Sequence, residues 1–177
     1  MALGLLFPAF GPQSRQADAG FTSGFFWRAS EPWSAGLPGP VDGGGALWYE
    51  PSFDSSSWSS ISLPDVNSIG ANPGYDRFYR AVVFVASPAT FDHIAFQSDD
   101  GLWLYVNGTF LDSWGNGGCT NNPPGSCATN QNVPPIDIRP YLQAGSNIVA
   151  VRLNNAAGPT SYFDLNTAPE PTPSPTP

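Results

Sequence analysis

Short apolar runs separated by Gly, Pro, Asn and Ser make up most of the chain from residue 46 onward. Their lengths and their β-branched and aromatic residues predict strands. Eight short strands with no helical window between them predict an all-β fold of two antiparallel sheets packed as a sandwich. The predicted strands are Ala46–Glu50, Phe78–Ser87, Phe91–Ser98, Leu102–Asn107, Thr109–Trp114, Ile136–Leu142, Asn147–Asn154 and Ser161–Leu165.

The clearest local pattern is a hairpin centred on Asn107-Gly108. Asn-Gly suits the two positive-φ positions of a type I′ turn between antiparallel strands. Alternation in the preceding strand places Leu102, Leu104 and Val106 on one face, which we expect to face the core. The opposite face carries Trp103 and Tyr105, either under a loop or as a surface platform.

The run Phe78–Val85 is apolar at both odd and even positions. This pattern predicts a central strand that is covered on both faces.

Four segments are expected along the chain. Residues 1–20 are an apolar N-terminal segment, read as a signal remnant ending in Ala17-Asp18-Ala19 or as a retained assembly strand. Residues 21–45 are a Gly, Pro and aromatic lead-in, interpreted as a loop with one short strand that caps the core, and residues 46–166 form the sandwich. Residues 167–177 are a Pro/Thr/Ser linker or tail, in which Thr172, Ser174 and Thr176 are candidate O-glycosylation sites.

Composition excludes several classes of protein. The 177 residues include 20 Pro and 19 Gly, which argue against a helical bundle. The net charge of −8, with six arginines and no lysine, offers no basic face for nucleic acid. The apolar runs are also too short for a membrane span.

Cys119 and Cys127 lie eight positions apart in a polar loop. We interpret them as a local disulfide, which indicates a secreted or cell-surface protein. Asn107-Gly108-Thr109 also fits an N-glycosylation sequon, although the tight turn explains both the asparagine and the glycine.

Four motifs resemble galactose-binding-like jelly rolls, the sugar-binding domains of β-galactosidase-type hydrolases. They are Phe53–Trp58 with Ile61–Pro64, Arg77–Arg80, Val106–Gly108, and Asp137–Leu142 with Gly145–Arg152. They follow the order of the family and cover about residues 45–165. The resemblance implies a jelly-roll β-sandwich and a non-catalytic carbohydrate-binding role.

A second resemblance, to PA14-type domains, covers Gln97–Gly108 and Asp112–Gly115. In lectin-like members of that family paired aspartates bind calcium, which implies calcium ligation by Asp99 and Asp100, with Asn116 or Asn154 as a further ligand. The alternative is a turn in which both acids accept hydrogen bonds from backbone amides.

Aromatic and amide side chains near the hairpin form a candidate sugar site. Trp103, Tyr105, Trp114 and Asn116 combine ring faces with a hydrogen-bonding group, as ligand sites commonly do. The alternative is that the rings fill the core or support loops. Arg80 and Arg152 lie in strands and are expected to pair with acids or cover aromatic rings.

We expect no enzyme activity, because no nucleophile is paired with a base and no carboxylate pair stands out. The leading hypothesis is an extracellular β-sandwich module for recognition, through carbohydrate binding or adhesion to neighbouring surface proteins. The alternative is a self-assembling subunit of a filament or surface layer, whose segment Leu3–Phe10 adds to the sheet edge of another subunit.

Overall fold

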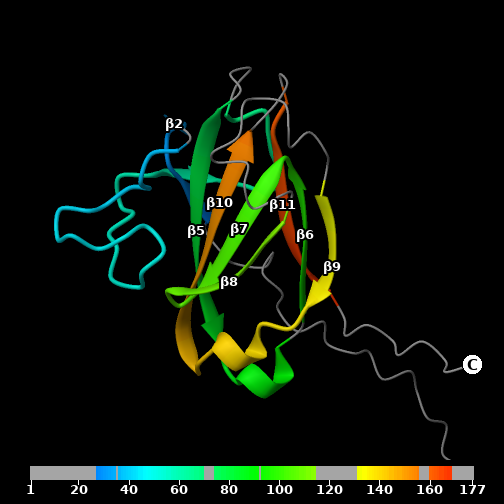
Figure 1. Ribbon diagram of the computed structural model, residues 1–177. Helices are drawn as coiled ribbons and strands as arrows, with labels where there is room; N and C mark the ends of the chain where they lie inside the picture. Colours follow the sequence, from blue (N-terminus) through cyan, green and yellow to red (C-terminus); the bar gives the residue numbers. More distant parts are fainter. Residues whose placement is uncertain are drawn as a thin grey trace, which may run out of the picture.

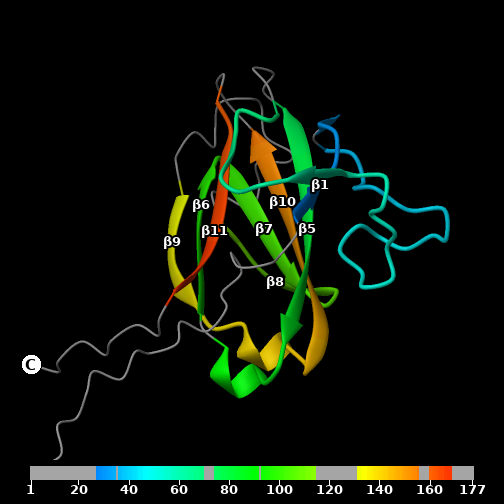
Figure 2. The same ribbon diagram turned by 180° about the vertical axis from the view of Figure 1, so that it is seen from behind.

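The computed structural model describes residues 27–34, 36–69, 74–91, 93–114, 131–155 and 160–168. Two antiparallel sheets lie face to face in these ranges, as the sequence predicts (Figure 1 and Figure 2). Apolar side chains of both sheets meet between the layers, so the protein is a β-sandwich. None of the helices in these ranges has the length and apolar character needed to cross a lipid bilayer.

The larger sheet has seven strands, in the order β3-β1-β5-β10-β7-β8, and β2 pairs with the start of β5. β5 and β10 pair over their full lengths and form the middle of the sheet. The strands are β1 (Trp27–Ala29), β2 (Trp33–Ser34), β3 (Ser59–Ile61), β5 (Tyr75–Val85), β7 (Gly101–Val106), β8 (Thr109–Trp114) and β10 (Gly145–Asn155).

The smaller sheet has four strands in the order β4-β11-β6-β9. Two short 3-10 helices, η1 (Pro88–Thr90) and η2 (Arg139–Tyr141), lie at one end of the sandwich. The four strands are β4 (Asp65–Val66), β6 (His93–Asp99), β9 (Gln131–Ile136) and β11 (Tyr162–Ala168). Within the described ranges six of the eight predicted strands are present, and β1 to β4 and β9 are additional. β1 to β4 have only two or three residues each, and β1 and β2 both lie in the lead-in, where we expect one short strand.

The core lies between the sheets and follows the predicted alternation. Leu102, Leu104 and Val106 of β7 are fully buried, as expected, and meet Phe96 and Phe163 of the smaller sheet in one cluster. Burial of such side chains removes apolar surface from water and is the main favourable contribution to folding.

The Asn107-Gly108 turn is confirmed, with φ of 50° at Asn107 and 83° at Gly108. The Asn107 amide donates to Tyr141 O and to Asn147 Oδ1, both at 2.8 Å, and its Oδ1 accepts from Ile148 N. The turn is therefore tied to the start of β10 as well as to its own hairpin.

Two predicted strands are wrong. Residues 46–50 form turns, with only an isolated bridge between Val41 and Leu47. β9 ends at Ile136, where the predicted strand Ile136–Leu142 begins. The residues after it form a turn and η2, because Pro140 lacks an N–H and the Asp137 carboxylate accepts from Arg139 N at 2.9 Å. A local apolar pattern does not distinguish these turns from strands.

The expected covering of β5 on both faces is also only partly correct. The outer side chains Val82 and Phe84 are 57% and 69% exposed, whereas Val83 and Val85 are buried in the core. The outer face of β5 is therefore covered at Phe78 and Arg80 and exposed to solvent at Val82 and Phe84.

Candidate functional site

Residues 36–58, called the covering loop, leave the sandwich and pack on the outer face of the larger sheet (Figure 1, blue to cyan at the left). Trp48 and Phe53 of this loop are buried against Phe78 of β5 and Ala150 of β10. The ring centroids of Trp48 and Phe78 are 4.7 Å apart. These contacts form an outer cluster on the opposite face of the sheet from the core.

Arg80 of β5 holds the covering loop on the sheet by hydrogen bonds. Its guanidinium donates to the carbonyls of Trp48, Glu50 and Phe53, the last two at 3.0 and 3.4 Å. Burial lowers the pKa of Arg80 to about 10, so the side chain remains charged at neutral pH. A charged donor thus satisfies loop carbonyls that no β-ladder satisfies.

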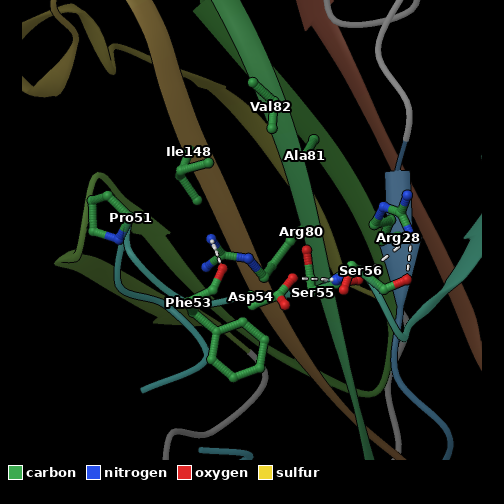
Figure 3. Close-up of a pocket in the computed structure, with 10 residues that line it drawn as sticks. All are labelled: Arg28, Pro51, Phe53, Asp54, Ser55, Ser56, Arg80, Ala81, Val82 and Ile148. Carbon is green, nitrogen blue, oxygen red and sulfur yellow. Dashed lines mark hydrogen bonds between the residues drawn. The ribbon is translucent and has the colours of Figure 1, made fainter. Parts of the chain in front are cut away.

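Arg28 of β1 holds the end of the same loop. It donates to the carbonyls of Ser56 and Trp58, both at 3.0 Å. The arginine lies beside the loop, next to Ser56 (Figure 3).

Two carboxylates of the covering loop, together with Arg80 and Arg28, form the hydrogen-bonded framework that holds the loop. Asp42 accepts from the backbone N–H of Gly44, Ala46 and Asp54 at 2.8 to 2.9 Å, and the bond from Asp54 is the main reason its pKa is lowered. Asp54 accepts from Ser56 N at 2.8 Å in an Asx turn, and this bond lowers its pKa. Both carboxylates are therefore ionised at neutral pH.

A groove of about 540 Å³ lies where the covering loop meets β5 and β10 (Figure 3). The strands contribute aliphatic side chains, Val82 and Ile148, and the loop contributes a carboxylate and hydroxyls across from them. The groove therefore offers both apolar and hydrogen-bonding surface. Its lining residues are Arg28, Pro51, Phe53, Asp54, Ser55, Ser56, Arg80, Ala81, Val82 and Ile148.

The predicted aromatic site is divided by the sheet. Tyr105 is stacked on Tyr49 of the covering loop, with centroids 4.5 Å apart, and burial raises its pKa. Trp103 lies on the same outer face, where the Arg152 guanidinium is 5.0 Å from its ring. Trp114 instead pairs opposite core-facing Leu102 and contacts Phe96, so it does not join the other two.

Arg152 confirms the expectation for strand arginines, since it pairs with the buried carboxylate of Asp76 and lies over aromatic rings. Burial is the main reason that the pKa of Asp76 is raised, and the attraction of Arg152 opposes it. Arg80 also covers a ring, that of Phe53, at 5.2 Å.

The predicted calcium ligands lie at the junction of β6 and β7. Asp99 accepts from Thr160 Oγ1 at 2.9 Å, and Asp100 is buried with its N–H donating to Asn154 O at 3.1 Å. Within the described ranges, no group of three or more His, Cys, Asp or Glu side chains gathers in a metal-binding arrangement. Calcium binding stays a prediction.

The modification sites divide between described and undescribed residues. Both hydrogens of the Asn107 side-chain amide are engaged in the turn described above, and N-glycosylation there stays a prediction. Asn116, Cys119, Cys127, Thr172, Ser174 and Thr176 lie outside the described residues, as do the segments 1–20 and 169–177.

No protein-family model and no curated protein matches the sequence. Its structure is similar to a glycosyl hydrolase family 2 member from Bacteroides cellulosilyticus, with 18% identity, a TM-score of 0.44, and coverage of 79% of this chain and 20% of that one. It is also similar to a β-glucuronidase of glycoside hydrolase family 2, with 13% identity and a TM-score of 0.45, over 80% of this chain and 17% of that one. The β-glucuronidase of Ruminococcus gnavus has 13% identity and a TM-score of 0.45, over 82% of this chain and 29% of that one.

The chain thus spans less than a third of each of these enzymes. Identities and TM-scores this low do not transfer a function. The fold assignment therefore depends on the two sheets themselves, and the function on the chemistry of the groove.

Proposed function

We propose that this protein is a non-catalytic recognition module that binds neutral carbohydrate in the groove between the covering loop and β5. The observation that carries the proposal is the two-sided lining, with Val82 and Ile148 facing Asp54 and the loop serines. A sugar presents C–H groups and hydroxyls on one small ring and suits such a lining. The volume of about 540 Å³ lies within the usual range of ligand pockets.

The polar groups of the groove suit the hydroxyls of a neutral ligand. Asp54 is ionised and accepts hydrogen bonds from hydroxyl groups, while Arg28 and Arg80 direct their donors to loop carbonyls. These two guanidinium groups offset the charge of Asp54 within the groove, and the net charge of −8 disfavours an anionic ligand at longer range.

Binding is favoured over hydrolysis by the composition of the lining. Glycoside hydrolysis commonly uses two carboxyl groups about 5 to 9.5 Å apart on either side of the bond. Asp54 is the one acid among the residues that line the groove. It also accepts a backbone hydrogen bond that lowers its pKa, the opposite of what a general acid needs.

Calorimetric titration with cellohexaose, mannohexaose, xylohexaose and laminarihexaose tests the proposal. Val82→Asp places a charge on the apolar side of the groove and is expected to abolish the binding that the unmodified protein shows. Val66→Asp is the matched control, because Val66 of β4 is 55% exposed and lies outside the groove.

Titrations with added calcium chloride and with EDTA separate this site from the predicted calcium ligands, which do not line the groove. Equal affinities are expected in both. Absence of binding to all four sugars under both conditions would overturn the proposal.

A second candidate function, self-association, is favoured by the edge of β5. β1 pairs with Tyr79–Ala81 and β2 with Tyr75–Asp76, so within the described ranges the Val82–Val85 segment pairs with β10 alone. The segment carries no charge, and its residue Phe84 is exposed. Natural edge strands usually carry charges or bulges that prevent pairing with another chain.

The proposed partner at this edge is an apolar strand of another copy, for which the sequence predicts Leu3–Phe10. Sedimentation velocity over a concentration series tests this role, and Phe84→Asp is expected to shift the protein towards monomer. A protein that is monomeric at every concentration would exclude self-association.

A further inference from the structure

A second hollow, of about 220 Å³, is lined by residues that follow the loop residues of the groove directly along the chain. Residues 53–56 line the groove, and Ser57, Trp58 and Ser59 line the second hollow. The lining of the second hollow also includes Glu31 and Trp33. Consecutive residues of one short segment therefore line both hollows.

Trp33 is held in a fixed orientation. Its indole Nε1 donates to Pro38 O at 3.0 Å, and its ring meets Phe78 edge-on, at 6.4 Å and 84°. The side chain is nevertheless 36% exposed. Because the ring nitrogen already has a partner, the exposed part offers carbon and π surface, and little conformational entropy is lost when a ligand packs on it.

The remaining lining supplies hydrogen-bonding groups around this ring. Glu31, Ser57 and Ser59 are all exposed, and Trp58 is half-buried behind them. A carboxylate and two hydroxyls next to an indole are complementary to a sugar ring, whose C–H groups pack on the aromatic surface while its hydroxyls donate to the acid. The Glu31 carboxylate disfavours an anionic sugar in this hollow, whose lining has no basic residue.

We infer that the Trp33 hollow is a second subsite for a neutral sugar ring, so that one oligosaccharide occupies the groove and this hollow together. The inference rests on the proposed function of the groove. It names an oligosaccharide as the ligand class and assigns Trp33 to ring packing and Glu31 to hydroxyl binding.

The test is calorimetry with the same four hexasaccharides, using Trp33→Ala, Glu31→Gln and Val82→Asp. Trp33→Ala is expected to weaken binding about three- to tenfold, the contribution of one aromatic contact. Glu31→Gln is expected to weaken it about tenfold, through loss of a charged hydrogen-bond acceptor. Phe110→Ala is the matched control, because Phe110 is an exposed aromatic residue outside both hollows that also packs on one neighbouring ring.

Circular dichroism of each variant shows whether it is folded. If Trp33→Ala is unfolded, Trp33→Leu, which keeps an apolar side chain but removes the ring, and Glu31→Gln test the subsite. Unchanged affinity in the folded Trp33 and Glu31 variants, with binding lost in Val82→Asp, would overturn the second subsite and leave the groove in place.

Loss of binding in the Trp33 and Glu31 variants alone, with Val82→Asp unaffected, would overturn the shared ligand and move the site away from the groove. Absence of sugar binding by the unmodified protein would overturn both proposals.

Discussion

The two faces of the larger sheet carry apolar clusters that are built differently. The core cluster comes from regular strands of both sheets, whose backbone groups are satisfied by the β-ladders. The outer cluster comes from the covering loop, where Trp48 and Phe53 are buried but three backbone carbonyls depend on Arg80. The core therefore stabilises the fold, and one buried cation shapes the surface that we propose binds sugar.

The largest expected effect comes from the core. Leu104→Ala removes a fully buried side chain and is expected to lower the free energy of unfolding by about 2–5 kcal/mol. Urea denaturation measures this change. At temperatures where the variant is folded, its sugar affinity is expected to equal that of the unmodified protein, and a lost affinity would show that the two clusters are coupled.

Replacing the anchor of the covering loop is expected to have a smaller effect on stability and a larger one on binding. Arg80→Met leaves the carbonyls of Trp48, Glu50 and Phe53 without their donor, at a cost of about 1–3 kcal/mol. Sugar binding is expected to be lost while circular dichroism retains the β-sandwich spectrum. Arg80→Lys, which keeps the charge, serves as the control, and full binding by Arg80→Met would contradict the anchoring role.

Acid is expected to loosen the covering loop before the strands. The pKa values of Asp42 and Asp54 are lowered from 3.8, so their contribution to loop stability is present above that pH and is lost as the pH falls through the lowered values. The pKa of Asp76 is raised, so its contribution is present below 3.8 and is lost as the pH rises through the raised value. Acidification therefore destabilises the covering loop but does not destabilise β5 through Asp76.

Amide hydrogen exchange measures this difference. Protection of the Gly44, Ala46 and Asp54 amides, which donate to Asp42, is expected to fall below pH 3.8 while β5 and β10 remain protected. Asp42→Asn should remove most of the pH dependence. Simultaneous loss of protection in loop and strands would show that the two regions unfold as one unit.

The sandwich and the hairpin are predictable because they depend on neighbouring residues. The alternation in β7 and the Asn107-Gly108 turn each lie within a few positions of the chain, and both are confirmed. Trp114 was misplaced because the β7–β8 register shifts at Leu104/Tyr105, and its partner across the strands is core-facing Leu102. Alternation within one strand does not reveal a shift between two.

The groove was not predicted because its framework depends on contacts between distant residues. Arg80 lies 27 to 32 positions from the carbonyls that it binds. Gly39 is required for a similar reason, since a Cβ there would lie 2.4 Å from the Trp48 ring. The Asx turn at Asp54 is local, whereas the covering loop that contains it depends on these contacts between distant residues.

The central claim is that the covering loop and β5 form a sugar-binding groove. A titration followed by amide NMR, with the hexasaccharide that calorimetry selects, tests it most directly. The account predicts shifts concentrated at residues 28–33, 51–59, 80–82 and 148, the linings of the two hollows. Shifts confined to the smaller sheet, or to Asp99 and Asp100, would contradict it.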